Sequence, residues 1–239
     1  MGIEIRVIAS GSKGNCYIVS DGESNLMLDC GIPYADIQEA CGFDLVDGIN
    51  GVLVTHEHGD HIKAAKHLIK SAVNVYASRG TLEAVNLSGH RAKVLRANSI
   101  YTIGTFSVLP FEVEHDASEP FGYLLRSNVT KEKLLYFTDT YYLKYRFNGL
   151  NYIMGECNFS TEIAEKNVRE GYMTPELLPR LHKSHMSLEH FIDFLKANDT
   201  TNVKRVYLLH LSDGNSDERM FVQKVKEIVP NAEVMAFGN

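Results

Sequence analysis

Histidine and aspartate residues are concentrated in one short segment of this chain, His56-Glu57-His58-Gly59-Asp60-His61. Neutral imidazoles and carboxylates are ligands suited to zinc and related divalent ions. In a nearly extended backbone His56 and His58 point the same way, so both can reach one ion. Asp60 and His61 lie where the chain turns into a predicted helix, so they can face a second ion. Such a cluster at a strand end rarely arises from packing alone, and it predicts a metal site.

Three later residues are ligands of the same types: His115, Asp139 and His210. Each follows an apolar segment that predicts a buried strand. The number of candidate ligands suits two metal ions, each with an open coordination position for water, as a catalytic site requires. A closed structural zinc site more commonly includes cysteines, and these segments contain none. We therefore expect His56, His58 and His115 at one ion, Asp60, His61 and His210 at the second, and Asp139 between them.

The composition is that of an ordinary globular protein, with 239 residues, 44% hydrophobic residues and a net charge of −6. This length fits one large domain, which we expect to span residues 1–239. The sequence has no apolar run of about twenty residues, so no membrane span is indicated. Its start predicts a strand and not a secretion signal. The cysteines show no C-x-x-C spacing and are typical of reduced thiols in a cytoplasmic protein.

The acidic charge argues against indiscriminate binding to nucleic acid, but it does not exclude a local basic track. Candidate basic patches are Lys63/Lys66/Lys70, Arg91/Lys93/Arg96 and Arg180/Lys183. For each patch taken alone, a solvated helix or loop face is the favoured interpretation.

Strand patterns alternate with helix patterns along the chain, which predicts an α/β fold with sheets covered by helices. We find no internal repeat and no linker. Strands are predicted at 3–8, 16–20, 25–29, 51–55, 74–77, 106–114, 122–126, 134–138, 152–156, 203–209 and 233–237. Helices are predicted at 34–40, 62–70, 81–87, 160–169, 175–181, 188–197 and 216–228.

The order H-x-H-x-D-H, followed by His115, Asp139 and His210, resembles the ligand order of the metallo-β-lactamase superfamily. The resemblance covers nearly the whole chain. It implies an α/β fold, an αββα sandwich, with a dinuclear metal site at one edge of the two sheets. It says little about the substrate.

The flanking segments narrow the resemblance to the YycJ-like (WalJ-like) branch. That branch implies a cytoplasmic nuclease with 5′-to-3′ exonuclease action on DNA. The chain departs from the branch at Cys30 and Cys157, where alanine is expected, and at Met186, where leucine is usual. The matching segments are 8–17, Leu28-Asp29-Cys30-Gly31, Glu156-Cys157-Asn158, Ser184-His185-Met186-Ser187 and His210-Leu211-Ser212.

We therefore expect a metal-dependent hydrolase that cleaves phosphodiester bonds of nucleic acid, most readily DNA. Two divalent ions are expected as cofactors, with zinc favoured and manganese as the alternative. The expected catalytic residues are Asp60, Asp139 and His185. His185 could protonate the departing oxygen or bind a phosphate, or it could simply precede a helix that starts near Ser187.

Other residues near the motifs have structural interpretations. Asp29 is expected to anchor the ligand loop by hydrogen bonds. Glu156 could support a metal ligand or start a helix. Surface or packing roles are expected for His67, His90, His182 and His190.

Rival functions use the same residues differently. The ions could polarise the carbonyl of a small thioester, lactone or lactam, or the protein could bind metal without catalysis. The presence of every expected ligand weighs against the second rival. Di-iron redox chemistry is disfavoured because that variant of the fold places a carboxylate where His58 stands. The sequence does not indicate an oligomeric state.

Overall fold

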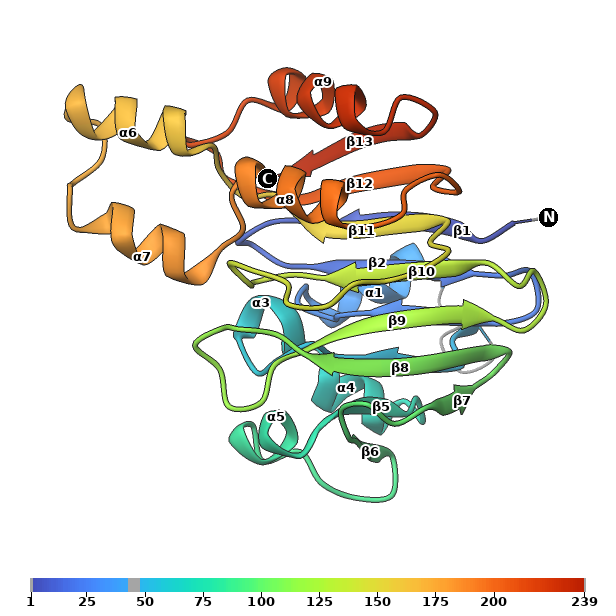
Figure 1. Cartoon of the computed structure of the whole chain (residues 1–239). Coiled ribbons are helices and arrows are strands. Elements are labelled where there is room, and N and C mark those ends of the chain that lie inside the picture. Colours follow the sequence, from blue (N-terminus) through green and yellow to red (C-terminus); the bar gives the residue numbers. More distant parts are fainter. Residues whose placement is uncertain (1, 43–47, 239) are drawn as a thin grey trace. The chain divides into compact units, whose positions relative to one another are not determined.

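The computed structural model describes residues 2–42 and 48–238. The chain forms two compact units (Figure 1), the first made of Met1–Glu112 and Ala117–Glu132, and the second of Val113–Asp116 and Lys133–Asn239. Each unit contains strands and helices. The single domain expected over 1–239 stays a prediction.

The first unit is built on a sheet with the strand order β1-β2-β3-β4-β5-β6. Its first three strands are antiparallel neighbours, whereas β3 to β6 run parallel. Strands β7, β8 and β9 pair antiparallel and belong to a seven-stranded sheet of order β13-β12-β11-β10-β9-β8-β7. The strands of this unit are β1 (Glu4–Ala9), β2 (Cys16–Ser20), β3 (Asn25–Leu28), β4 (Gly51–Leu53), β5 (Val75–Ser78), β6 (Ala92–Leu95), β7 (Tyr101–Ile103), β8 (Phe106–Glu112) and β9 (Phe121–Ser127).

One face of the six-stranded sheet is covered by helices, because alternate strand residues share an apolar core with the helices' inner faces. Met27, Val52 and Val75 contribute from the strands, and Ile37 and Leu68 contribute from the helices. The helices of this unit are α1 (Tyr34–Ala40), α3 (Gly59–Ile62), α4 (Ala65–Lys70) and α5 (Arg79–Ala84).

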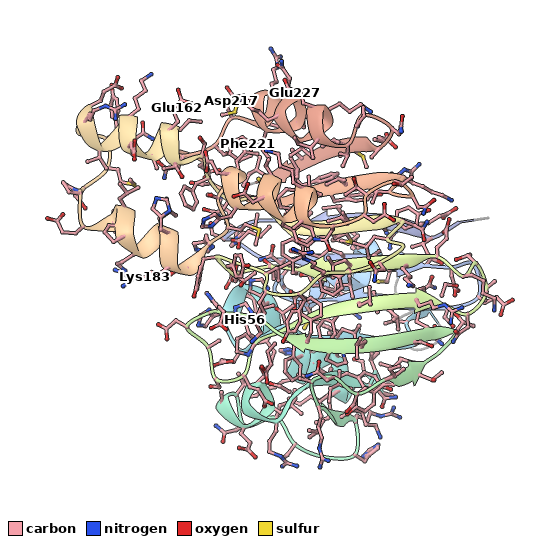
Figure 2. All side chains as sticks on the ribbon, viewed as in Figure 1. His56, Glu162, Lys183, Asp217, Phe221 and Glu227 are labelled. Atoms are coloured by element: carbon pink, nitrogen blue, oxygen red, sulfur yellow. The ribbon has the colours of Figure 1, made fainter. Side chains whose placement is uncertain are left out.

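The second unit has the parallel strands β10 (Lys133–Phe137), β11 (Tyr152–Glu156), β12 (Arg205–Leu211) and β13 (Glu233–Gly238), hydrogen-bonded in this order. Every residue of β11 is buried, as expected for a parallel strand covered on both faces. Fully buried Phe221 anchors α9 (Figure 2). The remaining helices are α6 (Thr161–Arg169), α7 (Leu177–Ser184), α8 (Leu188–Ala197) and α9 (Glu218–Ile228).

Most predicted elements are present, and several differ in their bounds or number. The helix predicted at 62–70 is two helices, α3 and α4, because the backbone N–H of Ala64 donates to Cys30 instead of continuing one helix. Strands β6 and β7 were not predicted, and α7 begins and ends later than the predicted 175–181. Among the described residues, every helix is too short or too polar to cross a membrane.

Candidate metal centre

The loop after β4 brings the four ligands predicted for the first segment into one cluster. The ring of His56 lies 4.7 Å from that of His58 and 4.2 Å from that of His61, between centroids. Nε2 of His61 lies 3.4 Å from a carboxylate oxygen of Asp60. Figure 2 labels His56 on this loop. The first unit therefore gathers imidazoles and a carboxylate as the sequence predicts.

Asp29 directly follows β3, and its side chain anchors this loop by hydrogen bonds. Its carboxylate accepts hydrogen bonds from the backbone N–H and the hydroxyl of Thr55, at 2.8 and 3.1 Å, and lies 2.8 Å from Nδ1 of His61. With Nδ1 donating to Asp29, Nε2 is the nitrogen of His61 that could bind a metal, an arrangement typical of metal-binding histidines. Asp29 has a φ of 54°, so its backbone is itself strained to reach this position. The anchoring role expected for Asp29 is confirmed.

The loop before β2 and the segment after β3 both support the ligand loop through main-chain contacts. The backbone N–H of Asn15 donates to the carbonyl of Asp60 at 2.8 Å, and that of Cys30 donates to the carbonyl of His61 at 2.8 Å. Gly31 lies so close that a Cβ atom there would come within 1.6 Å of the Asp60 carbonyl oxygen. The contact therefore requires glycine at position 31, and it explains why these segments accompany the histidine motif.

A second cluster lies at the carboxyl ends of β10, β11 and β12. These strands are parallel, so their ends meet at the same edge of the sheet. Asp139, Glu156, His185 and His210 each place a donor atom there, all within 4.8 Å of one another. Asp139 and His210 have φ values of 46° and 57°, a left-handed conformation that is uncommon for such residues and marks functional sites.

The sequence predicted that His210 directly follows the end of its strand, but the strand includes His210. Strand β12 continues to Leu211, and its pairing with β13 is irregular between Leu208 and Leu211. The positive φ of His210 falls within this irregular stretch, and Nδ1 of the side chain lies 2.9 Å from Asp139. Irregular pairing of this kind commonly redirects a side chain beside an active site.

Glu156 contacts both histidines of the second cluster, His185 and His210. The sequence left open whether this residue supports a metal ligand or starts a helix. Its side chain is fully buried, with one oxygen 2.5 Å from Nδ1 of His185 and 3.1 Å from Nδ1 of His210. The other oxygen accepts from the backbone N–H groups of Thr140 and Met186 at 3.1 and 3.2 Å. Glu156 therefore ends β11 and does not start a helix. Its signal in the sequence was its position, an acid at the end of a buried apolar strand.

The pKa values in this cluster follow from burial opposed by charge. Burial alone would raise the pKa of Glu156, but the adjacent His185 and His210 lower it. Burial alone would lower the pKa of His185, but Glu156 and Asp139 raise it. For His210 the same opposition, led by Asp139, raises the pKa to about 10. The negative charge of Glu156 and Asp139 that stabilises the protonated imidazoles would also stabilise a divalent cation, so the donor set fits a metal ion.

His115 belongs to the second unit and lies beside Asp139, with Nε2 3.8 Å from a carboxylate oxygen. Strand β8 ends at Glu112, earlier than the predicted 114. The second unit thus gathers His115, Asp139, His185 and His210.

The other histidines have the surface or packing roles expected of them. The His67 ring stacks on Tyr34, and the His182 ring packs edge-on against Phe159. His90 and His190 are exposed.

Comparisons with known proteins agree on the family. Residues 25–211 match the beta-lactamase superfamily domain. The chain is 32% identical to the exodeoxyribonuclease YycJ of Bacillus anthracis, covering 95% of this chain and 90% of the relative. It is 27% identical to the exodeoxyribonuclease WalJ of Streptococcus pneumoniae, covering 90% and 84%.

Solved structures confirm the fold. The metallo-beta-lactamase fold protein YhfI from Bacillus subtilis superposes with a TM-score of 0.74 and 16% identity, covering 99% of this chain and 97% of the other. The short form of human tRNase Z superposes with a TM-score of 0.61 and 14% identity, covering 97% and 95%. The predicted α/β sandwich is thereby confirmed. The chain belongs to the YycJ- and WalJ-like branch of the metallo-β-lactamase superfamily, and it is a hydrolase.

Proposed function

We propose that this protein is a metal-dependent nuclease that hydrolyses phosphodiester bonds of DNA as a 5′-to-3′ exonuclease. The observation that carries the proposal is the cluster of Asp139, Glu156, His185 and His210, whose donor atoms lie within 4.8 Å of one another. It occurs in a chain whose relatives at 32% and 27% identity are named exodeoxyribonucleases. A carboxylate and imidazole cluster of this kind suits phosphoryl transfer, where catalysis is mainly positioning and charge stabilisation.

We assign two divalent ions to the chain, with zinc favoured and manganese as the alternative. Such ions supply positive charge for the phosphate and lower the pKa of a water nucleophile. The first three ligands are His56, His58 and His115. The second three would be Asp60, His61 and His210, with Asp139 shared between the two sets.

Three side chains are assigned to the chemical step: Asp60, Asp139 and His185. Asp139 and Asp60 are the carboxylates that we propose would orient the attacking water and take up the proton that it loses. His185 donates a proton to the departing oxygen through Nε2, because Nδ1 faces Glu156 at 2.5 Å. Its raised pKa, caused by Glu156 and Asp139 against the opposing effect of burial, keeps this proton available near neutral pH.

A cytoplasmic location completes the proposal. The four cysteines are free thiols, and Cys16, Cys30 and Cys157 are buried, which fits a reducing compartment where DNA is accessible.

The test is cleavage of oligonucleotides labelled at the 5′ or the 3′ end, as DNA and as RNA, by protein of measured metal content. We expect stepwise release from the 5′ end of DNA, loss of activity with a chelator, and recovery when zinc or manganese is restored. Asp139→Asn should remove most of the turnover. Asp193→Asn, on the exposed side of α8, is the matched control and should cleave like the wild type.

Two results would contradict the proposal. The first is no cleavage of any DNA or RNA by fully metallated protein that turns over a thioester or a lactone. The second is full nuclease activity in the Asp139→Asn variant.

A further inference from the structure

A cavity of about 310 Å³ opens beside His185 in the second unit. Its volume is at the lower end of the range for small-molecule sites, roughly 300–1,000 Å³. Besides His185, its wall is formed by Met173, Leu177, Arg180, Leu181, Ser184 and Asn215. Helix α7 thus supplies most of one side of the cavity.

Packing accounts only in part for the apolar residues of α7, since Leu178 and Leu181 are half-buried and Leu177 is exposed. The helix contains no buried residue, and Leu177 is 45% exposed. A surface helix in a folded protein normally buries an apolar stripe against a core. Here Leu177 and Leu181 instead line the cavity, together with Met173. The apolar side of α7 is therefore available to a ligand.

The charge of α7 differs from that of its neighbour α6 (Figure 1). On α6, Lys166 and Arg169 each face an acidic residue one turn away, at 3.9 Å. Helix α7 carries Arg180 and Lys183, and its sequence Leu177–Ser184 has no acidic residue. Within the described part of the chain, Arg180 has no ion-pair partner. In a chain with a net charge of −6, these two cations give the helix a local positive charge, and Figure 2 labels one of them, Lys183.

The cavity and the candidate catalytic cluster share one residue, His185. His185 lines the cavity, while its Nδ1 lies 2.5 Å from Glu156 and 3.7 Å from Asp139. A substrate whose reacting phosphate lies at Asp139 would therefore extend its neighbouring nucleotide toward α7. Apolar side chains suit the faces of a base, and an arginine suits a phosphate.

We propose that this cavity binds the nucleotide next to the scissile phosphodiester of a single-stranded nucleic acid. The base lies against Leu177 and Leu181, and the guanidinium of Arg180 binds the adjoining phosphate. A base that enters this cavity is unpaired, so the cavity selects single-stranded ends. This inference rests on the proposed nuclease function and names the part of the substrate that the second unit recognises.

The test compares Arg180→Gln and Leu177→Ala with Arg169→Gln, a control on α6 that removes an exposed arginine outside the cavity. The substrate is a single-stranded DNA oligonucleotide, cleaved by the metallated protein at several salt concentrations. We expect Arg180→Gln to raise KM about tenfold or more, with little change in kcat. The slope of log(kcat/KM) against log salt should become shallower by about 0.7, the value for one phosphate contact on a single strand. Leu177→Ala should raise KM about fivefold without changing this slope.

A KM and a salt slope equal to those of the wild type in Arg180→Gln would overturn the inference. A loss confined to kcat would also overturn it, since it would place Arg180 with the chemical step. The phosphodiester bis(p-nitrophenyl) phosphate separates this failure from that of the proposed function. If the wild type hydrolyses that ester but no oligonucleotide, the nuclease proposal itself is overturned, and this inference falls with it.

Discussion

Glu156 lies 2.5 Å from Nδ1 of His185 and connects the end of β11 to the C-terminal end of α7. The two residues are 29 positions apart, and the side chain of Glu156 is fully buried while that of His185 is 25% exposed. The carboxylate thereby fixes one nitrogen of the imidazole and turns the other away from itself. The same oxygen lies 3.1 Å from Nδ1 of His210, so one carboxylate orients both histidines.

The first prediction concerns this carboxylate. Burial lowers the pKa of His185, and the negative charge of Glu156 raises it. Glu156→Gln removes that charge, so the pKa of His185 should fall. A proton donor works below its own pKa, and the basic limb of the kcat–pH profile should therefore move to lower pH. We expect kcat at neutral pH to fall about tenfold to a hundredfold. Glu162→Gln on α6, an exposed site labelled in Figure 2, is the control and should keep the wild-type profile. An unchanged basic limb in Glu156→Gln would show that His185 does not donate the proton.

The second prediction concerns the support of the ligand loop. Gly31→Ala places a Cβ atom within 1.6 Å of the Asp60 carbonyl, and backbone must move to relieve the clash. We expect the variant to lose metal bound by Asp60 and His61, and most of its activity. Gly59→Ala is the matched control, because its added Cβ meets nothing within 4 Å although it lies in the same motif. Metal content by elemental analysis decides, and equal retention in the two variants would refute the role given to Gly31.

The third prediction concerns the pH dependence of stability. Asp21 is buried and accepts hydrogen bonds from the hydroxyls of Thr105 and Ser127, each at 2.7 Å. Burial raises the pKa of Asp21, but these hydroxyls, with Ser127 foremost, outweigh it and hold the pKa below its usual value. Because the folded pKa is the lower one, the stabilisation is present above the unfolded pKa of about 3.9 and is lost as pH falls through the folded pKa.

Asp21→Asn should therefore lower the free energy of unfolding at pH 7 by about 1–3 kcal/mol. Urea denaturation of the wild type and the variant at pH 7 and near pH 3 measures this. The two proteins should differ less at the acidic pH. A difference of the same size at both pH values would mean that the charge of Asp21 contributes nothing.

Elements with strong local signals were predictable from the sequence. The predicted bounds are correct for α1, α8 and β11. Helix α8 shows why: its apolar residues recur at helical spacing, and its start is capped by Ser187, whose hydroxyl accepts a hydrogen bond from the backbone N–H of His190. Strands β6 and β7 were missed because they are short and partly exposed, and they owe their conformation to pairing with neighbouring strands. The division between α3 and α4 depends on a contact with Cys30, which no local pattern encodes.

The site was predictable as a set of ligands but not as a network. Side chains at strand ends could be recognised by type and position, and the structure gathers them within each unit. The pairing of Glu156 with His185, and that of Asp29 with His61, joins segments 29 and 32 residues apart. The cavity beside α7 depends on where that helix lies, which its sequence does not specify.

The central claim is the proposed assignment of His58 and His115 to one metal ion, and elemental analysis tests it most directly. His58→Ala and His115→Ala each remove one proposed ligand of that ion. The wild type, purified without chelator, should contain more than one and up to two equivalents. Each single variant should lose about one equivalent, and the double variant should lose the same one and no more. Full metal content in the double variant, or losses that add to both ions, would contradict the account.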